Sequence, residues 1–213
     1  MAGRSKILSV DFYTQPTSNT CQSTCLKMMS SYVEGSDGTT PGPAASLNPV
    51  DIYHTINHDP GRPDKANQNS HQNMMWWLKQ RFPNLKFKEI VTKDEIKAEE
   101  TIINSIDRDS PVMVGVSHSR VHGHIILVIG YVNYQPYTCS QDFGLVVHDP
   151  YGRFDPSLSS DKYGAKRFNG GASLVTGGEV GPGKSVILPL TSVSRQRQGD
   201  ASRGNYFLIF VDR

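Results

Sequence analysis

The sequence predicts an α+β fold in which an N-terminal helical part packs on a C-terminal antiparallel sheet. From Cys25 to Val33 apolar residues recur at spacings of three and four, the period of a helix with one buried face, and the first half of the chain is mainly helical. After Ser110 the sequence changes to short runs rich in β-branched and aromatic residues, which are typical of strands. A chain of 213 residues is long enough for one full core and short for two, so we expect one domain over residues 1–213.

The expected elements follow from local patterns. A short strand over Ile7–Tyr13 leads into a turn, and a helix should begin near Cys21. Three more helices are predicted over residues 50–56, 72–82 and 94–106, and strands over 112–116, 125–131, 145–148, 186–190 and 206–211. Residues 152–184 form the longest stretch without periodicity and are expected to be a loop.

Composition excludes several classes of partner. The formal net charge of +2 is spread along the chain without a dense Lys/Arg run, so we expect no nucleic acid partner. The sequence has no run of about 18 apolar residues, the length that could span a membrane, and Met1–Val10 lacks the apolar core of a signal peptide. We therefore expect synthesis in a cytoplasm. Three cysteines argue against a disulfide framework and for at least one free thiol.

Cys21 is the candidate nucleophile. At the start of a helix, the N–H groups without intrahelical partners and the positive end of the helix dipole favour a thiolate. A cysteine there can also be a small buried apolar residue, so Cys21 alone proves little. Gln15, six residues earlier, could point its side-chain NH2 into the same space and stabilise an oxyanion.

His124 and Asp149 are the candidate partners of that thiol. His124 opens a very apolar strand directly after Gly123, which allows another chain to approach closely. Its imidazole could act as the general base. Asp149 follows the next strand, where a carboxylate could orient the imidazole, although Asp-Pro-x-Gly is also a common turn.

These segments, in this order, resemble the C39-like cysteine peptidases, a family with the papain fold. The resemblance rests on residues 9–15, 20–29 and 123–131 and on Asp-Pro-Tyr-Gly at 149–152. It implies Cys21 as nucleophile, His124 as base, Asp149 as orienting group and Gln15 as oxyanion donor. Many members have glycine at the position of Gln22, and the bulkier glutamine could narrow the pocket beside the nucleophile.

The resemblance also bears on the substrate. The best-known members precede peptide-exporting transporters, a role that does not transfer because this sequence has no membrane segment and no Walker A motif. Similar stand-alone domains occur in bacteriophage lysins and envelope enzymes, which implies a peptide or peptidoglycan cross-bridge or stem peptide, cleaved in the cell envelope or by a virion component. We expect substrate contacts from Gln22, Gly123, Tyr151 and Trp77, no metal or other cofactor, and leave the oligomeric state open.

Three alternatives remain open at this point. Cys25 could join His118, His122 and His124 in a zinc site, although the apolar run after Cys25 indicates that it packs inward. The fold could serve as a non-catalytic binding module or virion component. The same Cys-His-Asp set could also carry out acyl transfer, since only the group that attacks the thioester differs.

Overall fold

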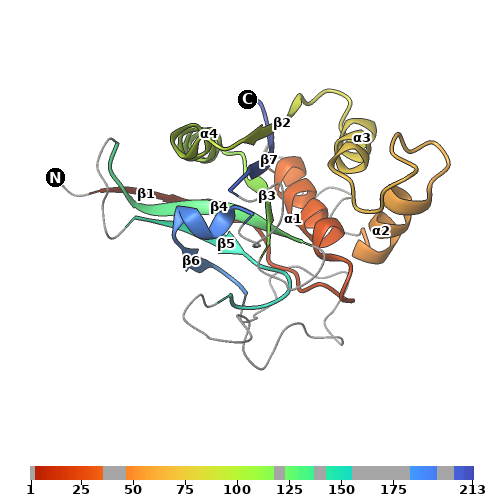
Figure 1. Ribbon diagram of the computed structural model, residues 1–213, viewed down its shortest axis with the longest axis horizontal. Coiled ribbons are helices and arrows are strands. Elements are labelled where there is room, and N and C mark those ends of the chain that lie inside the picture. Colours follow the sequence, from red (N-terminus) through yellow and green to blue (C-terminus); the bar gives the residue numbers. More distant parts are fainter. Residues whose placement is uncertain (1–2, 36–46, 118–122, 137–142, 155–182, 196–203) are drawn as a thin grey trace.

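The structure is a computed structural model of mixed helices and antiparallel sheet, which confirms the α+β prediction (Figure 1). It describes residues 3–35, 47–117, 123–136, 143–154, 183–195 and 204–213. Within these residues the buried apolar side chains form one cluster that includes side chains from both the helices and the sheet. The extent of the domain over the whole chain stays a prediction.

Four α-helices are described. They are α1 (Cys21–Gly35), α2 (Pro49–His58), α3 (His71–Arg81) and α4 (Glu95–Asp107). The starts of α2, α3 and α4 carry side-chain caps, since Asn48, Ser70 and Asp94 each accept a hydrogen bond from a first-turn backbone N–H. Among the described residues, no helix has the length and apolar character needed to cross a membrane.

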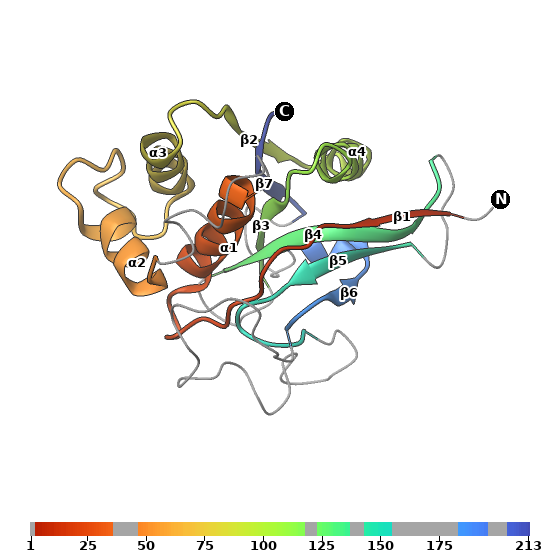
Figure 2. The ribbon, with the colours of Figure 1, turned by 180° about the vertical axis from the view of Figure 1, so that it is seen from behind.

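Over the described ranges the sheet has seven strands, all paired antiparallel. They are β1 (Arg4–Ile7), β2 (Phe87–Thr92), β3 (Val112–Val116), β4 (His124–Tyr134), β5 (Gly144–His148), β6 (Val186–Leu188) and β7 (Tyr206–Val211). The order is β2-β7-β3-β4-β5-β6, and β1 pairs with β4 outside this path. Figure 2 shows β1 running alongside β4, whose first residues pair with β3 and whose last residues pair with β1.

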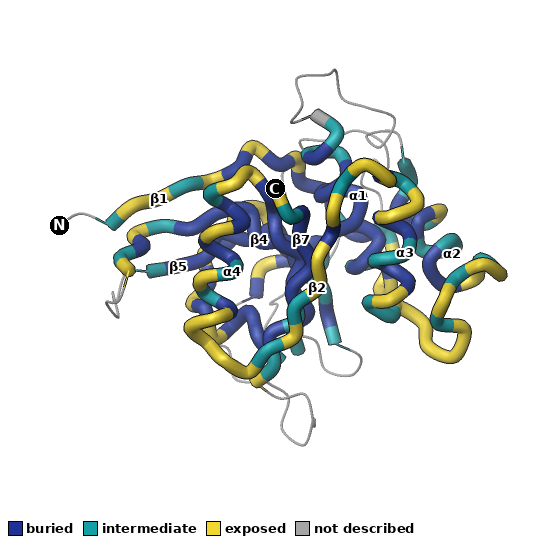
Figure 3. Tube along the Cα trace, turned by 90° about the horizontal axis from the view of Figure 1, so that it is seen from above, coloured by how far each residue is buried: buried dark blue, intermediate teal, exposed yellow. Residues whose placement is uncertain are grey.

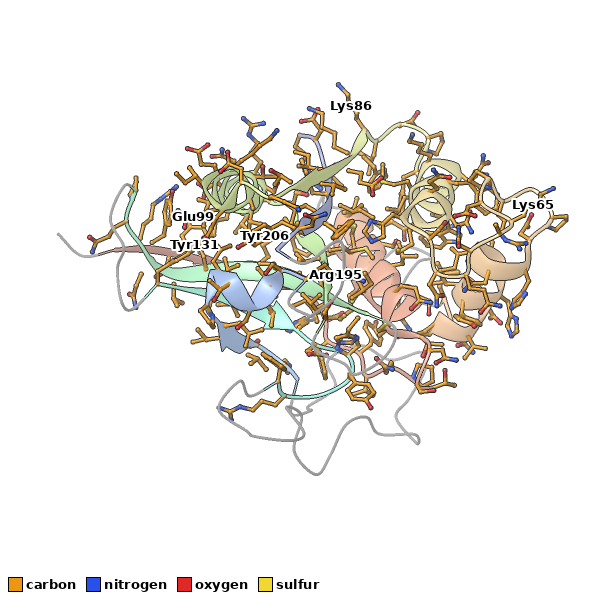
Figure 4. The ribbon with its side chains drawn as sticks, viewed as in Figure 1. Lys65, Lys86, Glu99, Tyr131, Arg195 and Tyr206 are labelled. Atoms are coloured by element: carbon orange, nitrogen blue, oxygen red, sulfur yellow. The ribbon has the colours of Figure 1, made fainter. Side chains whose placement is uncertain are left out.

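The helices lie on different parts of the sheet. Helix α1 packs against β4, and α2 and α3 lie beyond α1 at one end of the molecule (Figure 1). Helix α4 packs on β4 and β7. The hydroxyl of Tyr131 in β4 donates to Oδ1 of Asp107, the last residue of α4, at 2.7 Å. Glu99 of α4 and Tyr206 of β7, both labelled in Figure 4, interact electrostatically, and burial, followed by the charges of Glu95 and Glu100, raises the pKa of Glu99. In Figure 3 the buried residues, in dark blue, lie mainly in β4, β7 and α1.

The sequence placed one strand of the sheet wrongly and missed another. The opening strand is Arg4–Ile7 rather than Ile7–Tyr13, because the carbonyl of Val10 accepts from the side chain of His148 instead of pairing with a strand. Exposed and buried residues therefore continue to alternate after Ile7, although this segment is not part of a strand. Strand β2 was not predicted, since it is an edge strand with only Phe87 buried and lacks a clear apolar alternation.

Candidate active site

Cys21 is the first residue of α1, as the turn before it predicts. The helix begins with the bond from Thr24 N–H to the Thr20 carbonyl, at 2.9 Å. The side chain of Thr20 bonds back to Thr17, outside the helix, which fixes the direction of the entering chain. The Cys21 side chain is partly exposed in an otherwise buried helix start. The thiol therefore sits at the positive end of the α1 dipole.

The sheet brings His124 and Asp149 together. His124 is the first residue of β4, and Asp149 directly follows the last residue of β5. The β4–β5 register pairs Leu127 with His148, so its continuation places His124 diagonally across from Asp149 on the same face. Nε2 of His124 lies 2.7 Å from Oδ1 of Asp149, and both side chains are almost completely buried. This is the contact expected of an imidazole and its orienting carboxylate.

The environment of His124 favours its protonated form. Burial disfavours the charged ring, but the charge and hydrogen bond of Asp149, together with the hydrogen bond and charge of Cys21, raise the pKa of His124 to about 10. Because Nε2 is used by Asp149, the nitrogen left for Cys21 is Nδ1. The imidazole therefore bridges the thiol and the carboxylate.

The second cysteine of α1 is chemically different from the first. Cys25 is fully buried, and its Sγ donates to the carbonyl of Ile125 at 3.4 Å. Burial, and then the charges of Cys21 and Asp149, raise the pKa of the Cys25 thiol well above its ordinary value. Cys25 thus stays a neutral thiol and ties α1 to the start of β4.

Gln15 lies next to the aspartate turn. Its backbone N–H donates to the carbonyl of Pro150 at 2.9 Å, and its buried side chain donates from Nε2 to the carbonyl of Thr17 at 2.7 Å. Its Oε1 has no hydrogen-bond partner among the described residues. One of the two N–H bonds of the amide is thereby used, and the role of Gln15 as oxyanion donor stays a prediction.

Gly123 and Tyr151 border the imidazole. Gly123 has φ +73°, a backbone conformation that favours glycine, whereas the nearest atom to a Cβ built here, Nη1 of Arg195 at 2.9 Å, is the movable end of a long side chain. Figure 4 labels Arg195 near the middle of the molecule. The centres of the Tyr151 and His124 rings lie 5.8 Å apart in an edge-to-face arrangement, and the backbone N–H of Tyr151 donates to Oδ1 of Asp149 at 2.9 Å.

Gln22 contacts the thiol directly, whereas Trp77 lies in the core. Sγ of Cys21 donates to Oε1 of Gln22 at 3.3 Å. Trp77 is 8% exposed and belongs to the buried cluster, so its role in substrate binding stays a prediction.

The zinc alternative receives no support from the described residues. Within them, no three His, Cys, Asp or Glu side chains are grouped as metal ligands. His118 and His122 lie outside the described residues, as does most of the predicted loop at 152–184. A hollow of about 410 Å³ lies elsewhere, lined by the ends of α1 and α3 and by none of the predicted site residues.

Sequence reasoning missed three residues that support the site. The ring of buried His148 donates from Nε2 to the Val10 carbonyl at 3.0 Å and accepts from the Ser185 N–H at 3.1 Å, next to Asp149. Asn57 and Asn69 bind each other, and Asn69 also binds Gln22. No local pattern marks these contacts, because they join residues far apart in the chain.

The comparisons with known proteins agree with this fold. The model of the Peptidase_C39 like family matches residues 7–169. Among solved structures, UfSP from C. elegans is similar over 100% of this chain with a TM-score of 0.56 and 12% identity, and the chain covers 35% of that protein. No curated protein sequence matches. The chain therefore belongs to the Peptidase_C39 like family, and its α+β fold is papain-like.

Proposed function

We propose that Cys21, His124 and Asp149 form the catalytic triad of this peptidase and that it cleaves an amide bond through a thioester intermediate. The observation that carries the proposal is the buried imidazole of His124, bonded to Asp149 at 2.7 Å through Nε2 and to Cys21 on its other side. Thiol peptidases use a thiol, a base and an orienting carboxylate that contact one another in this order.

The first half of the reaction forms the thioester. The proton that Cys21 and His124 share lies on the imidazole, as the raised pKa of His124 favours, and the thiolate sulfur attacks the amide carbonyl carbon while the π electrons move to the oxygen. The backbone N–H of Cys21 and the side-chain amide of Gln15 stabilise this oxyanion. When the intermediate collapses, the C–N bond breaks and His124 gives its proton to the leaving nitrogen. Asp149 stabilises the imidazolium throughout.

The second half hydrolyses the thioester. His124 takes a proton from water, the resulting hydroxide attacks the thioester carbon, and the second intermediate expels the Cys21 sulfur, which recovers the proton. The products are one amine and one carboxylic acid. The high pKa of His124 favours the form that protonates the leaving amine.

For the substrate, we propose a peptide or a peptidoglycan cross-bridge or stem peptide. The support is the resemblance to stand-alone C39-like domains of lysins and envelope enzymes, which also suggests action in the cell envelope or from a virion. The nearly complete burial of His124 and Asp149 leaves Cys21 as the partly exposed member of the triad, so the substrate must approach from the α1 start.

The test is digestion of purified peptidoglycan and of matched stem and cross-bridge peptides, with mass spectrometry of the products. Hydrolysis should give a new amine and a new carboxylate, whereas acyl transfer to an added amine would give a new amide. Cys21→Ala should abolish turnover, and Cys25→Ala is the matched control that should retain it. Turnover by Cys21→Ala would exclude the proposed nucleophile. If the free peptides were cleaved while the same peptides in purified peptidoglycan stayed intact, peptidoglycan would be excluded as the substrate.

A further inference from the structure

Three amide side chains form a chain of hydrogen bonds that ends on the nucleophile. Asn57, near the end of α2, is buried and bonds to Asn69, which lies just before α3. Asn69 bonds to Gln22, and Gln22 accepts from the Sγ of Cys21 at 3.3 Å. The chain links the α2–α3 connection, where Asn69 is exposed, to the thiol.

Backbone groups fix which end of each amide points where. Nδ2 of Asn57 donates to the carbonyl of Tyr53 at 3.0 Å, and Oδ1 of Asn57 accepts from the N–H of Asn69 at 2.5 Å. A carbonyl can only accept and an N–H can only donate, so the Asn57 amide has one orientation.

The orientation is passed on to Gln22. The second N–H of Asn57 Nδ2 reaches Oδ1 of Asn69 at 2.9 Å, so this atom of Asn69 must be the acceptor oxygen. Gln22 must then present Nε2 to Asn69. Its oxygen is therefore the atom left to face Cys21, at 3.3 Å from Sγ.

We infer that Asn57 and Asn69 are positioning residues that hold the Gln22 carbonyl oxygen on the Cys21 sulfur and so favour the thiol over the thiolate in the free enzyme. The inference rests on the proposed role of Cys21 as nucleophile. A hydrogen bond accepted from the neutral form of an acid opposes its ionisation. If the amide could turn over, its NH2 would instead donate to the thiolate.

The size of the effect sets its role. A neutral hydrogen bond contributes about 1 kcal/mol, or roughly fivefold in an equilibrium, which is less than a close charge contributes in a buried site. Cys21 interacts with His124, which favours the thiolate, and with the buried thiol of Cys25, and Asp149 lies behind His124. The Gln22 oxygen therefore tunes the activation of the thiol by His124 without preventing it.

Asn69→Gly tests the inference with little disturbance of the loop. Asn69 has φ +58°, which glycine adopts without strain, and the substitution removes the side-chain oxygen that accepts from both Gln22 and Asn57 while the backbone N–H that binds Asn57 stays. The rate of Cys21 alkylation by iodoacetamide is measured as a function of pH. We expect Asn69→Gly to raise the rate about fivefold on the acid limb of the profile and to leave the alkaline plateau unchanged. Gln22→Met, which removes the oxygen at similar volume, should have the same effect.

A double variant and a control complete the test. In the Gln22→Met background, Asn69→Gly should add nothing, because its effect passes through Gln22. Asn133→Gly is the matched control, since Asn133 also has positive φ (+55°) but lies near the far end of β4 from His124, and its profile should equal that of the wild type.

Two results would overturn the inference: an unchanged acid limb in Asn69→Gly, or an effect of Asn69→Gly that persists in the Gln22→Met background. Failure of the proposed triad itself gives a different result, namely that His124→Ala leaves Cys21 alkylation unchanged.

Discussion

The buried pair of His124 and Asp149 should make the free energy of unfolding depend on pH in a defined direction. The folded pKa of His124 is about 10, against an ordinary value of 6.5. Between these values the folded protein holds a proton that the unfolded chain releases. The free energy of unfolding should therefore be highest, as far as this group is concerned, below pH 6.5 and fall as the pH rises toward about 10.

Asp149→Asn tests this dependence. For one proton the slope is at most about 1.4 kcal/mol per pH unit, so the total over this window is several kcal/mol. Without the carboxylate, burial disfavours the imidazolium and the negative slope should disappear. The variant should be clearly less stable than the wild type near pH 6.5, and the difference should shrink toward pH 10. Turnover should fall without disappearing, because the Asn oxygen can still accept from Nε2.

The assay is urea unfolding at several pH values, followed by the fluorescence of tryptophan, since Trp77 is buried in the core. Asp107→Asn is the matched control, because Asp107 is a partly buried carboxylate that bonds Tyr131 and Arg4 rather than a histidine. It should lower stability without changing the slope. The same negative slope in Asp149→Asn and in the wild type would show that Asp149 does not hold the proton on His124.

Four further predictions concern residues around the pair. Cys25→Ala should lower the free energy of unfolding by about 1–2 kcal/mol in urea unfolding while Cys21 is still alkylated at the wild-type rate. Gln15→Ala should reduce kcat about 100-fold or more but leave alkylation unchanged, since alkylation forms no oxyanion; an equal loss in both would show that Gln15 only positions the thiol. Burial lowers the pKa of His148 although its bond to the Val10 carbonyl raises it, so thermal unfolding should show stability falling as the pH drops below 6.5; an Asn or Gln variant at 148 that kept this loss would contradict the assignment. Gly123→Ala should cost about 1–2 kcal/mol in urea unfolding and slow Cys21 alkylation, because alanine is strained at φ +73°.

The sequence was sufficient for the parts of the fold that depend on local patterns. The turn before Cys21 and the apolar spacing after it correctly predicted where α1 begins, and the strands at 112–116 and 206–211 have the predicted bounds. The nearness of His124 and Asp149 could be predicted because one opens a strand and the other follows its antiparallel neighbour.

The remaining features depend on tertiary contacts that no local pattern records. The segment after Ile7 has the burial of a strand, but a histidine side chain occupies the Val10 carbonyl. The edge strand β2 faces solvent and therefore lacks the apolar signal. The contacts of Gln22 with Asn69, and of Asn69 with Asn57, join an α1 residue to the α2–α3 connection, which sequence spacing cannot reveal.

Contacts between the two halves explain how a thiol on a helix and a base on a strand keep their relative geometry. The Cys25 thiol binds the carbonyl next to His124, and the backbone of Gln15 binds the carbonyl next to Asp149. The ring of His148, one residue before Asp149, binds the segment that leads into α1. Each tie lies within a few residues of a triad member, and each joins the chain around α1 to β4 or to the end of β5. Displacement of α1 together with the segment that leads into it would break all three ties, so the fold resists separation of the nucleophile from its base more strongly than the single contact between their side chains could.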